Sequence, residues 1–132
     1  MIIDDDQDDV ELFKEAFHEI IPSGLCISKE DGKEGLEFLT AEKNQLPDLI
    51  FLDLNMPRMN GIQCLQEIYR NPKISSIPVI IYTTSRQNAD EEETKKMGAV
   101  DFITKPSNYD EIKKVIQSSV KKYADVSRRS TE

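Results

Sequence analysis

Short apolar runs alternate along the chain with longer stretches whose apolar residues recur at helical spacing. The apolar runs predict five strands, at Ile2-Ile3, Leu25 to Ser28, Leu49 to Leu52, Val79 to Tyr82 and Val100 to Thr104. A helix is expected after each strand; the last is marked by the stripe Tyr109, Ile112, Ile116, Val120 and Tyr123. This alternation is typical of βα units built around a parallel sheet.

Two of these elements have distinctive patterns. The run from Leu49 to Leu52 is continuously apolar, which favours a central parallel strand that is covered on both faces. The fourth helix, expected from Ala89 to Met97, is nearly all charged, with acids first, bases last and Gly98 placed to close it. Because this helix has almost no apolar face, we expect it to pack weakly against the rest of the domain.

Composition limits the classes of function. The chain has 132 residues, enough for one domain, which we assign to residues 1–124, with residues 125–132 as a frayed tail. Its net charge of −8 argues against nucleic-acid binding, and no apolar run reaches the ~18 residues of a membrane helix. Cys26 and Cys64 lie in apolar stretches without metal-ligand spacing, so we expect buried free thiols and a cytoplasmic location.

Candidate chemistry follows the predicted strands. Asp4-Asp5-Asp6 follows the first strand, Asp53 closes the third, Thr83 follows the fourth and Lys105 follows the fifth. Because the carboxyl ends of parallel strands meet at one edge of a sheet, these side chains are expected to share a pocket. Carboxylates, a hydroxyl and an ammonium together suit a Mg²⁺-dependent phosphoryl acceptor. Asp6 or Asp8 is expected to cap the start of the first helix.

These residues resemble the receiver domains of two-component response regulators over essentially the whole chain. The matching segments are Ile3-Asp4-Asp5-Asp6, Leu52-Asp53-Leu54-Asn55-Met56-Pro57 with Gly61, Thr83-Thr84-Ser85, Gly98-Ala99 and Phe102-Ile103-Thr104-Lys105-Pro106. Within the family, the chain looks similar to the small single-domain regulators that accompany phytochromes. The resemblance implies an α/β fold: a flavodoxin-like, five-stranded doubly wound parallel sheet of order 2-1-3-4-5. That order comes from the family rather than from the spacing.

The resemblance also assigns roles at the site. It implies that Asp53 is the phosphoacceptor and binds Mg²⁺ directly, together with Asp5 and the backbone carbonyl of Asn55. Asp4 would bind the ion through water, and Lys105 would hold a phosphoryl oxygen.

Thr83 would hydrogen-bond a second phosphoryl oxygen and act with Phe102 as a conformational switch. The Lys105-Pro106 peptide bond is expected to be cis, again by resemblance.

The resemblance implies a phosphoacceptor rather than a turnover enzyme. The phosphoryl donor would be a sensor histidine kinase or a histidine phosphotransfer protein, and phosphorylation would switch partner binding or homodimer formation. No nucleic acid or membrane partner is expected.

Three other functions use related folds or residues. A haloacid dehalogenase-type phosphatase needs a second Asp two positions after its nucleophile, where this chain has Asn55. A flavodoxin needs a Ser/Thr/Gly-rich loop in place of Asp4-Asp5-Asp6. The main alternative is a degenerate receiver that acts only as an interaction module. Its mark would be loss of the acceptor Asp or the Lys, and both are present.

Overall fold

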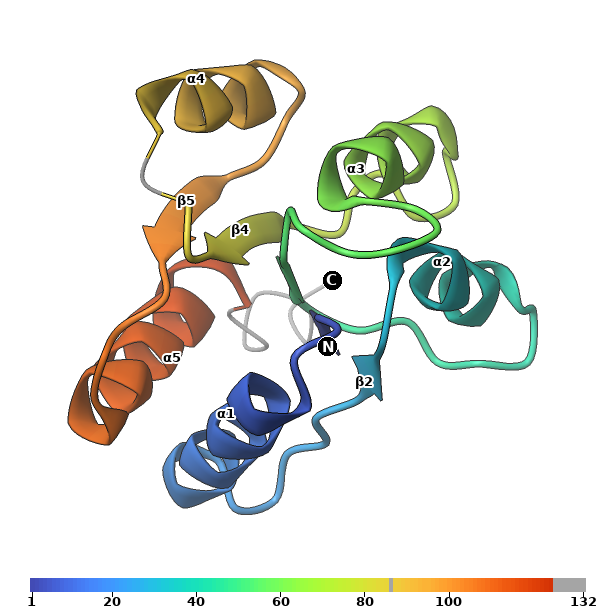
Figure 1. Cartoon of the computed structure of the whole chain (residues 1–132). Coiled ribbons are helices and arrows are strands. Elements are labelled where there is room, and N and C mark those ends of the chain that lie inside the picture. The colour runs from blue at the N-terminus through green and yellow to red at the C-terminus, as the bar shows by residue number, and fades with distance from the viewer. Residues whose placement is uncertain (86, 125–132) are drawn as a thin grey trace.

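Strands and helices alternate strictly in the computed structural model, which describes residues 1–85 and 87–124. In chain order the elements are β1 (Ile2–Ile3), α1 (Gln7–Ile20), β2 (Ser28–Lys29), α2 (Gly32–Thr40), β3 (Ile50–Leu52), α3 (Gly61–Arg70), β4 (Val79–Thr83), α4 (Asn88–Lys96), β5 (Asp101–Thr104) and α5 (Tyr109–Tyr123). Figure 1 shows the helices arranged around a central sheet. The predicted tail, residues 125–132, lies outside the described residues.

The sheet is parallel throughout, and its strand order is β2-β1-β3-β4-β5. In register, Ile2 lies opposite Phe51, and Leu52 lies opposite Ile81. The chain first winds outward to β2 and then reverses direction through β3, β4 and β5. The expected doubly wound order is therefore confirmed.

The central strand β3 is buried on both faces, as its continuous apolar run predicted. Ile50 and Leu52 pack into one core with residues of α2 and α3, whereas Phe51 packs into a second core with residues of α1 and α5. In the second core, the Phe13 ring meets the Phe51 ring edge-on at a centroid distance of 4.8 Å. Alternate residues along each strand therefore face opposite helical layers, which fixes the strand register.

Side-chain caps begin four of the helices. Asp6 accepts a hydrogen bond from the Asp9 amide at the start of α1, which confirms one of the two caps expected there. Asp31, Asn60 and Asn108 cap α2, α3 and α5 in the same way. Each such cap typically contributes about 1 kcal/mol and sets where its helix begins.

The second strand lies later in the sequence than predicted. The sequence suggested Leu25 to Ser28, but β2 contains only Ser28 and Lys29, and Leu25 is 79% exposed. The cause is β1: it offers only Ile2 and Ile3 as ladder partners, so β2 can pair only opposite them. Of the apolar residues before Ser28, Ile27 still accepts a backbone hydrogen bond from the Ile2 amide at 2.8 Å, and Cys26 is buried in the core.

The α4 helix buries few side chains, as its nearly all-charged sequence predicted. Thr94 is its only buried residue, and the Thr94 hydroxyl donates to the Asp90 carbonyl at 2.8 Å. Gly98 follows with a φ of +117°, a conformation that favours glycine, and so closes the helix as expected.

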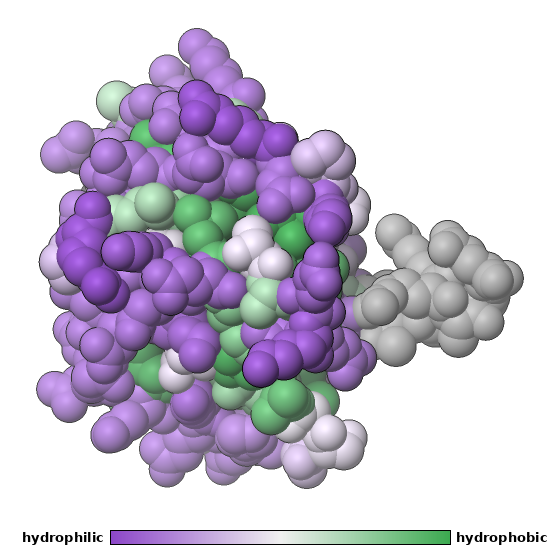
Figure 2. All heavy atoms as spheres, turned by 90° about the vertical axis from the view of Figure 1, so that its right-hand side faces the viewer, coloured by the Kyte–Doolittle hydropathy of each residue, from purple (hydrophilic) through white to green (hydrophobic). Residues whose placement is uncertain are grey.

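Hydrophilic side chains cover most of the face shown in Figure 2, and apolar side chains are visible in patches between them. Within residues 1–85 and 87–124, no helix combines the length and apolar character needed to cross a membrane. Cys26 and Cys64 are buried free thiols, as predicted, and burial raises the pKa of the Cys64 thiol to about 12.

Candidate phosphoacceptor site

The carboxyl ends of four strands bring the predicted residues to one edge of the sheet. Asp4 and Asp5 follow β1, Asp53 follows β3, Thr83 ends β4 and Lys105 follows β5. Backbone hydrogen bonds hold two pairs of these segments together. The Asp53 amide donates to the Ile3 carbonyl at 3.0 Å, and the Lys105 amide donates to the Thr83 carbonyl at 2.7 Å.

Three carboxylates form the centre of the site. Oxygens of Asp4, Asp5 and Asp53 all lie within 4.8 Å of one another. Asp4 and Asp53 are only 1% and 6% exposed, whereas Asp5 is exposed. Such a set of hard oxygen ligands fits Mg²⁺ or another divalent cation, because Mg²⁺ binds proteins through one or two carboxylates and keeps several waters.

Lys105 is the cation of the site. Its Nζ lies 2.7 Å from Asp4 Oδ2, 2.8 Å from Asp9 Oδ2 and 3.5 Å from Asp53 Oδ2. Burial by itself would lower the pKa of Lys105, but the ion pairs with Asp4 and Asp9 raise it above its ordinary value. The ammonium is therefore charged at neutral pH and faces more negative charge than it can balance.

Asp4 retains an oxygen that suits a further ligand. Its Oδ1 accepts a hydrogen bond from the Asp6 amide at 3.0 Å. Its buried Oδ2 forms the ion pair with Lys105 without accepting an aligned hydrogen bond. Burial raises the pKa of Asp4 to about 6, and the Lys105 ammonium partly opposes that rise.

The other predicted residues take different positions. Thr83 is buried, and its hydroxyl oxygen lies 3.4 Å from the Ser85 amide, which donates to it. Asn55 is exposed in the loop after β3, two residues beyond Asp53. The Lys105–Pro106 bond is trans, so the expected cis bond is wrong. Trans is the intrinsically preferred isomer even before proline.

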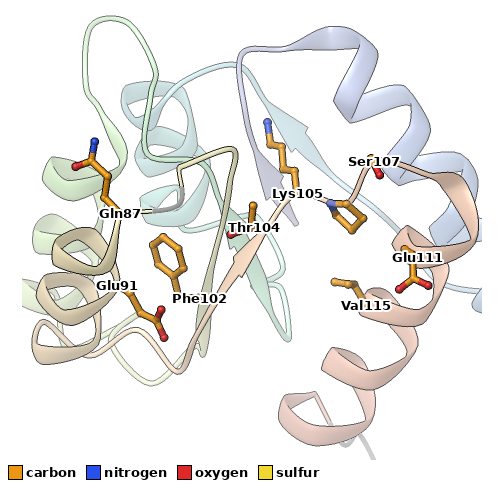
Figure 3. A pocket seen from close by; sticks show the side chains of 9 residues that line it. Gln87, Glu91, Phe102, Thr104, Lys105, Ser107, Glu111 and Val115 are labelled. Atoms are coloured by element: carbon orange, nitrogen blue, oxygen red, sulfur yellow. The ribbon is translucent and has the colours of Figure 1, made fainter.

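Phe102 is half-buried. It lines an open pocket of about 660 Å³ with residues of α4 and α5, among them Glu91 and Val115. In Figure 3 the Phe102 ring lies on the α4 side of this pocket, and the Lys105 side chain points away from both Phe102 and Val115. The phosphoacceptor site and the Phe102 pocket therefore lie on different sides of the segment that carries Lys105.

The loop after β3 is fixed to the start of α2. Arg58 in this loop adopts a φ of +60°, which is rare for a residue with a side chain, and its guanidinium pairs with Asp31 at 2.7 Å. The Gly32 amide donates to the Met59 carbonyl at 3.2 Å. These contacts hold the segment that follows Asp53.

Asp9 belongs to the site but was not among the predicted site residues. Helical spacing contained the signal, because Asp9 lies four positions before the buried Phe13 and therefore on the inner side of α1. Asp8 lies four positions before Leu12, which is exposed. Only Asp9 of this pair points to the sheet edge.

Comparison with known proteins identifies the family. The model of the response regulator receiver domain matches residues 1–117. Protein PilH of Pseudomonas aeruginosa is 35% identical over 92 residues, which cover 70% of this chain and 74% of PilH. Response regulator Rcp1 of Synechocystis sp. is 30% identical over 121 residues, which cover 89% of this chain and 82% of Rcp1.

Solved structures of response regulators superpose closely on this chain. The phosphorylated cyanobacterial phytochrome response regulator RcpA superposes with a TM-score of 0.86 at 26% identity, covering 95% of this chain and 92% of RcpA. The Mn²⁺-bound form of Rcp1 superposes with a TM-score of 0.78 at 27% identity, covering 94% and 92%. Receiver domains interact with histidine kinases and serve as phosphoacceptors rather than as turnover enzymes. This chain belongs to that family: it is a response regulator receiver domain of two-component signalling.

Proposed function

We propose that Asp53 accepts a phosphoryl group from a sensor histidine kinase or a histidine phosphotransfer protein, in a reaction that requires Mg²⁺. The observation that carries this proposal is the placement of the buried Asp53 carboxylate. It lies 3.5 Å from the Lys105 ammonium and within the cluster that includes Asp4 and Asp5. A degenerate receiver would not need these groups together. We take residues 1–124 as the receiver unit and the cytoplasm, where thiols stay reduced, as its location.

In the proposed reaction, a carboxylate oxygen of Asp53 attacks phosphorus in line with the leaving group. An O–P bond forms while the donor's N–P bond breaks, which gives an aspartyl-phosphate. Positioning and charge neutralisation supply most of the catalysis in phosphoryl transfer. Lys105 would contact one oxygen of the transferred group as a point charge.

Asp5, Asp53 and the Asn55 carbonyl would hold Mg²⁺ directly, and Asp4 would hold it through water. The ion would offset the excess negative charge that Lys105 leaves unbalanced. The existence of a Mn²⁺-bound form of Rcp1 supports the binding of a divalent cation by this chain. Asp4 Oδ2, which pairs with Lys105 without accepting an aligned hydrogen bond, could also accept from a water bound to the ion.

The phosphorylated state would be read through Thr83 and Phe102. A new dianion shifts a conformational equilibrium only through contacts that differ between the two states. The Thr83 hydroxyl, which now accepts from the Ser85 amide at 3.4 Å, would move to a phosphoryl oxygen. Phe102 would then turn inward and change the surface between α4 and α5, where a partner or a second copy binds.

Incubation with acetyl phosphate tests the proposed reaction. We expect the intact mass to increase by one phosphoryl group in Mg²⁺ and to stay unchanged with a chelator. The Asp53→Asn variant should stay unmodified under both conditions. Equal modification in the chelator would contradict the requirement for the metal ion.

A further inference from the structure

The Lys105 ammonium is held closer to Asp9 than to the proposed phosphoacceptor. Nζ lies 2.8 Å from Asp9 Oδ2 and 3.5 Å from Asp53 Oδ2. The Lys105 side chain is 8% exposed and that of Asp9 is 34% exposed. The contact therefore forms at the mouth of the site, where the ammonium is largely removed from water and the carboxylate only partly.

The helix fixes the position of Asp9. Asp9 lies in the first turn of α1, and its amide donates to the Asp6 cap at 3.2 Å. Four residues later, Phe13 is buried against Phe51 and Tyr82. Because this packing sets the rotation of α1, the Asp9 carboxylate is directed at Lys105 by the fold rather than by a mobile loop.

We propose that Asp9 is a positioning residue that holds Lys105 in its resting place and weakens the retention of a phosphoryl group at Asp53. This inference rests on the proposed function of Asp53. Two physical effects act in the same direction. The Asp9 carboxylate competes with phosphoryl oxygens for the Lys105 ammonium, and it repels the negative charge that those oxygens bring.

Asp8 provides a matched control. It lies in the same first turn, carries the same charge and contributes equally to the N-terminal end of the helix dipole. It is exposed, and of the two residues it is Asp9 that pairs with Lys105. Asp8→Asn therefore reproduces the loss of one charge without the loss of the ion pair.

Beryllofluoride, a phosphoryl mimic, provides the test. Its affinity for the full chain is measured by calorimetry at saturating Mg²⁺, and Mg²⁺ affinity is measured separately. We expect Asp9→Asn to bind the mimic about fivefold tighter than the wild type, since a partly exposed ion pair is lost. Asp8→Asn should bind like the wild type. In a Lys105→Gln background, the gain from Asp9→Asn should shrink, which a purely structural role of Asp9 would not produce.

The outcomes separate the two proposals. A wild-type chain that does not bind the mimic in Mg²⁺ overturns the proposed function and this inference with it. A wild type that binds, together with an Asp9→Asn variant that binds equally or more weakly, overturns the role of Asp9 alone. The role of Asp9 is also overturned if Asp8→Asn gains as much affinity for the mimic as Asp9→Asn does. It is likewise overturned if Asp9→Asn gains as much affinity in the Lys105→Gln background as in the wild type. If Lys105→Gln binds too weakly to measure, the comparison of Asp9→Asn with Asp8→Asn decides.

Discussion

The guanidinium of Arg58 and the carboxylate of Asp31 form an ion pair, with Nε and Nη2 both 2.7 Å from Oδ2. The other oxygen of Asp31 accepts the Glu34 amide at 2.9 Å and so caps α2. One carboxylate thus joins the start of α2 to the loop that follows Asp53. Burial alone would raise the pKa of Asp31, but the hydrogen bonds from Glu34 and Arg58 hold it below its ordinary value.

Asp31→Asn should destabilise the domain in a pH-dependent way. Asn retains the cap but loses the charge, so we expect a melting temperature a few degrees lower at pH 7. Because the folded-state pKa is depressed, the charge contributes fully above the ordinary value of 3.8 and is lost as pH falls through the folded value. Circular dichroism should therefore show the gap to wild type closing below that pH. Glu42→Gln, at an exposed site, serves as the control. This account would be contradicted if the difference in melting temperature persisted in acid, or if Glu42→Gln lowered the melting temperature equally.

Gly61→Ala should displace the loop that follows Asp53, because Gly61 lies where this loop ends and α3 begins. A Cβ at Gly61 would collide with the Asp53 carbonyl oxygen and lie 2.7 Å from Leu54 Cα, and neither backbone atom can turn aside. We expect the loop to shift and the rate of modification by acetyl phosphate to fall at least tenfold, because small misplacements are costly in group transfer. Gly24→Ala meets only side-chain atoms and serves as the control. An unchanged rate in Gly61→Ala would mean that the loop is not fixed at this contact.

The sequence predicted the sheet and the acidic edge because both follow simple periodic rules. Continuous apolar runs identified β3 and β4, and the parallel order placed the residues after each strand together. Two features depend on packing between elements and were not predicted. The limits of β2 are set by the shortness of β1, and the contact of Lys105 with Asp9 depends on the rotation of α1.

The α4 helix should be the least stable part of the described domain. Thr94 is its only buried residue, and Ala89 is exposed, so little apolar area holds the helix. We expect fast amide exchange from Gln87 to Met97 in the unphosphorylated protein, and slower exchange once beryllofluoride and Mg²⁺ bind. Protection equal to that of β3 would show that α4 is firmly packed.

Self-association or partner affinity should rise when the mimic binds, and Thr83 should transmit the change. Thr83→Val keeps the shape of the buried side chain but removes the hydroxyl, so it should bind the mimic and fail to respond. Sedimentation velocity with and without beryllofluoride compares the two proteins, and titration with a partner repeats the comparison. Identical behaviour of the wild type in both states would exclude this switch.

Mapping the modified residue tests the central claim most directly. After incubation with acetyl phosphate and Mg²⁺, the aspartyl-phosphate is reduced with borohydride to mark its position, and peptides are sequenced by mass spectrometry. We predict that the mark lies on Asp53 alone and that Asp53→Asn carries none. A mark on Asp4, Asp5 or Asp9 in the wild type, or undiminished labelling of Asp53→Asn, would contradict the assignment of Asp53 as the phosphoacceptor.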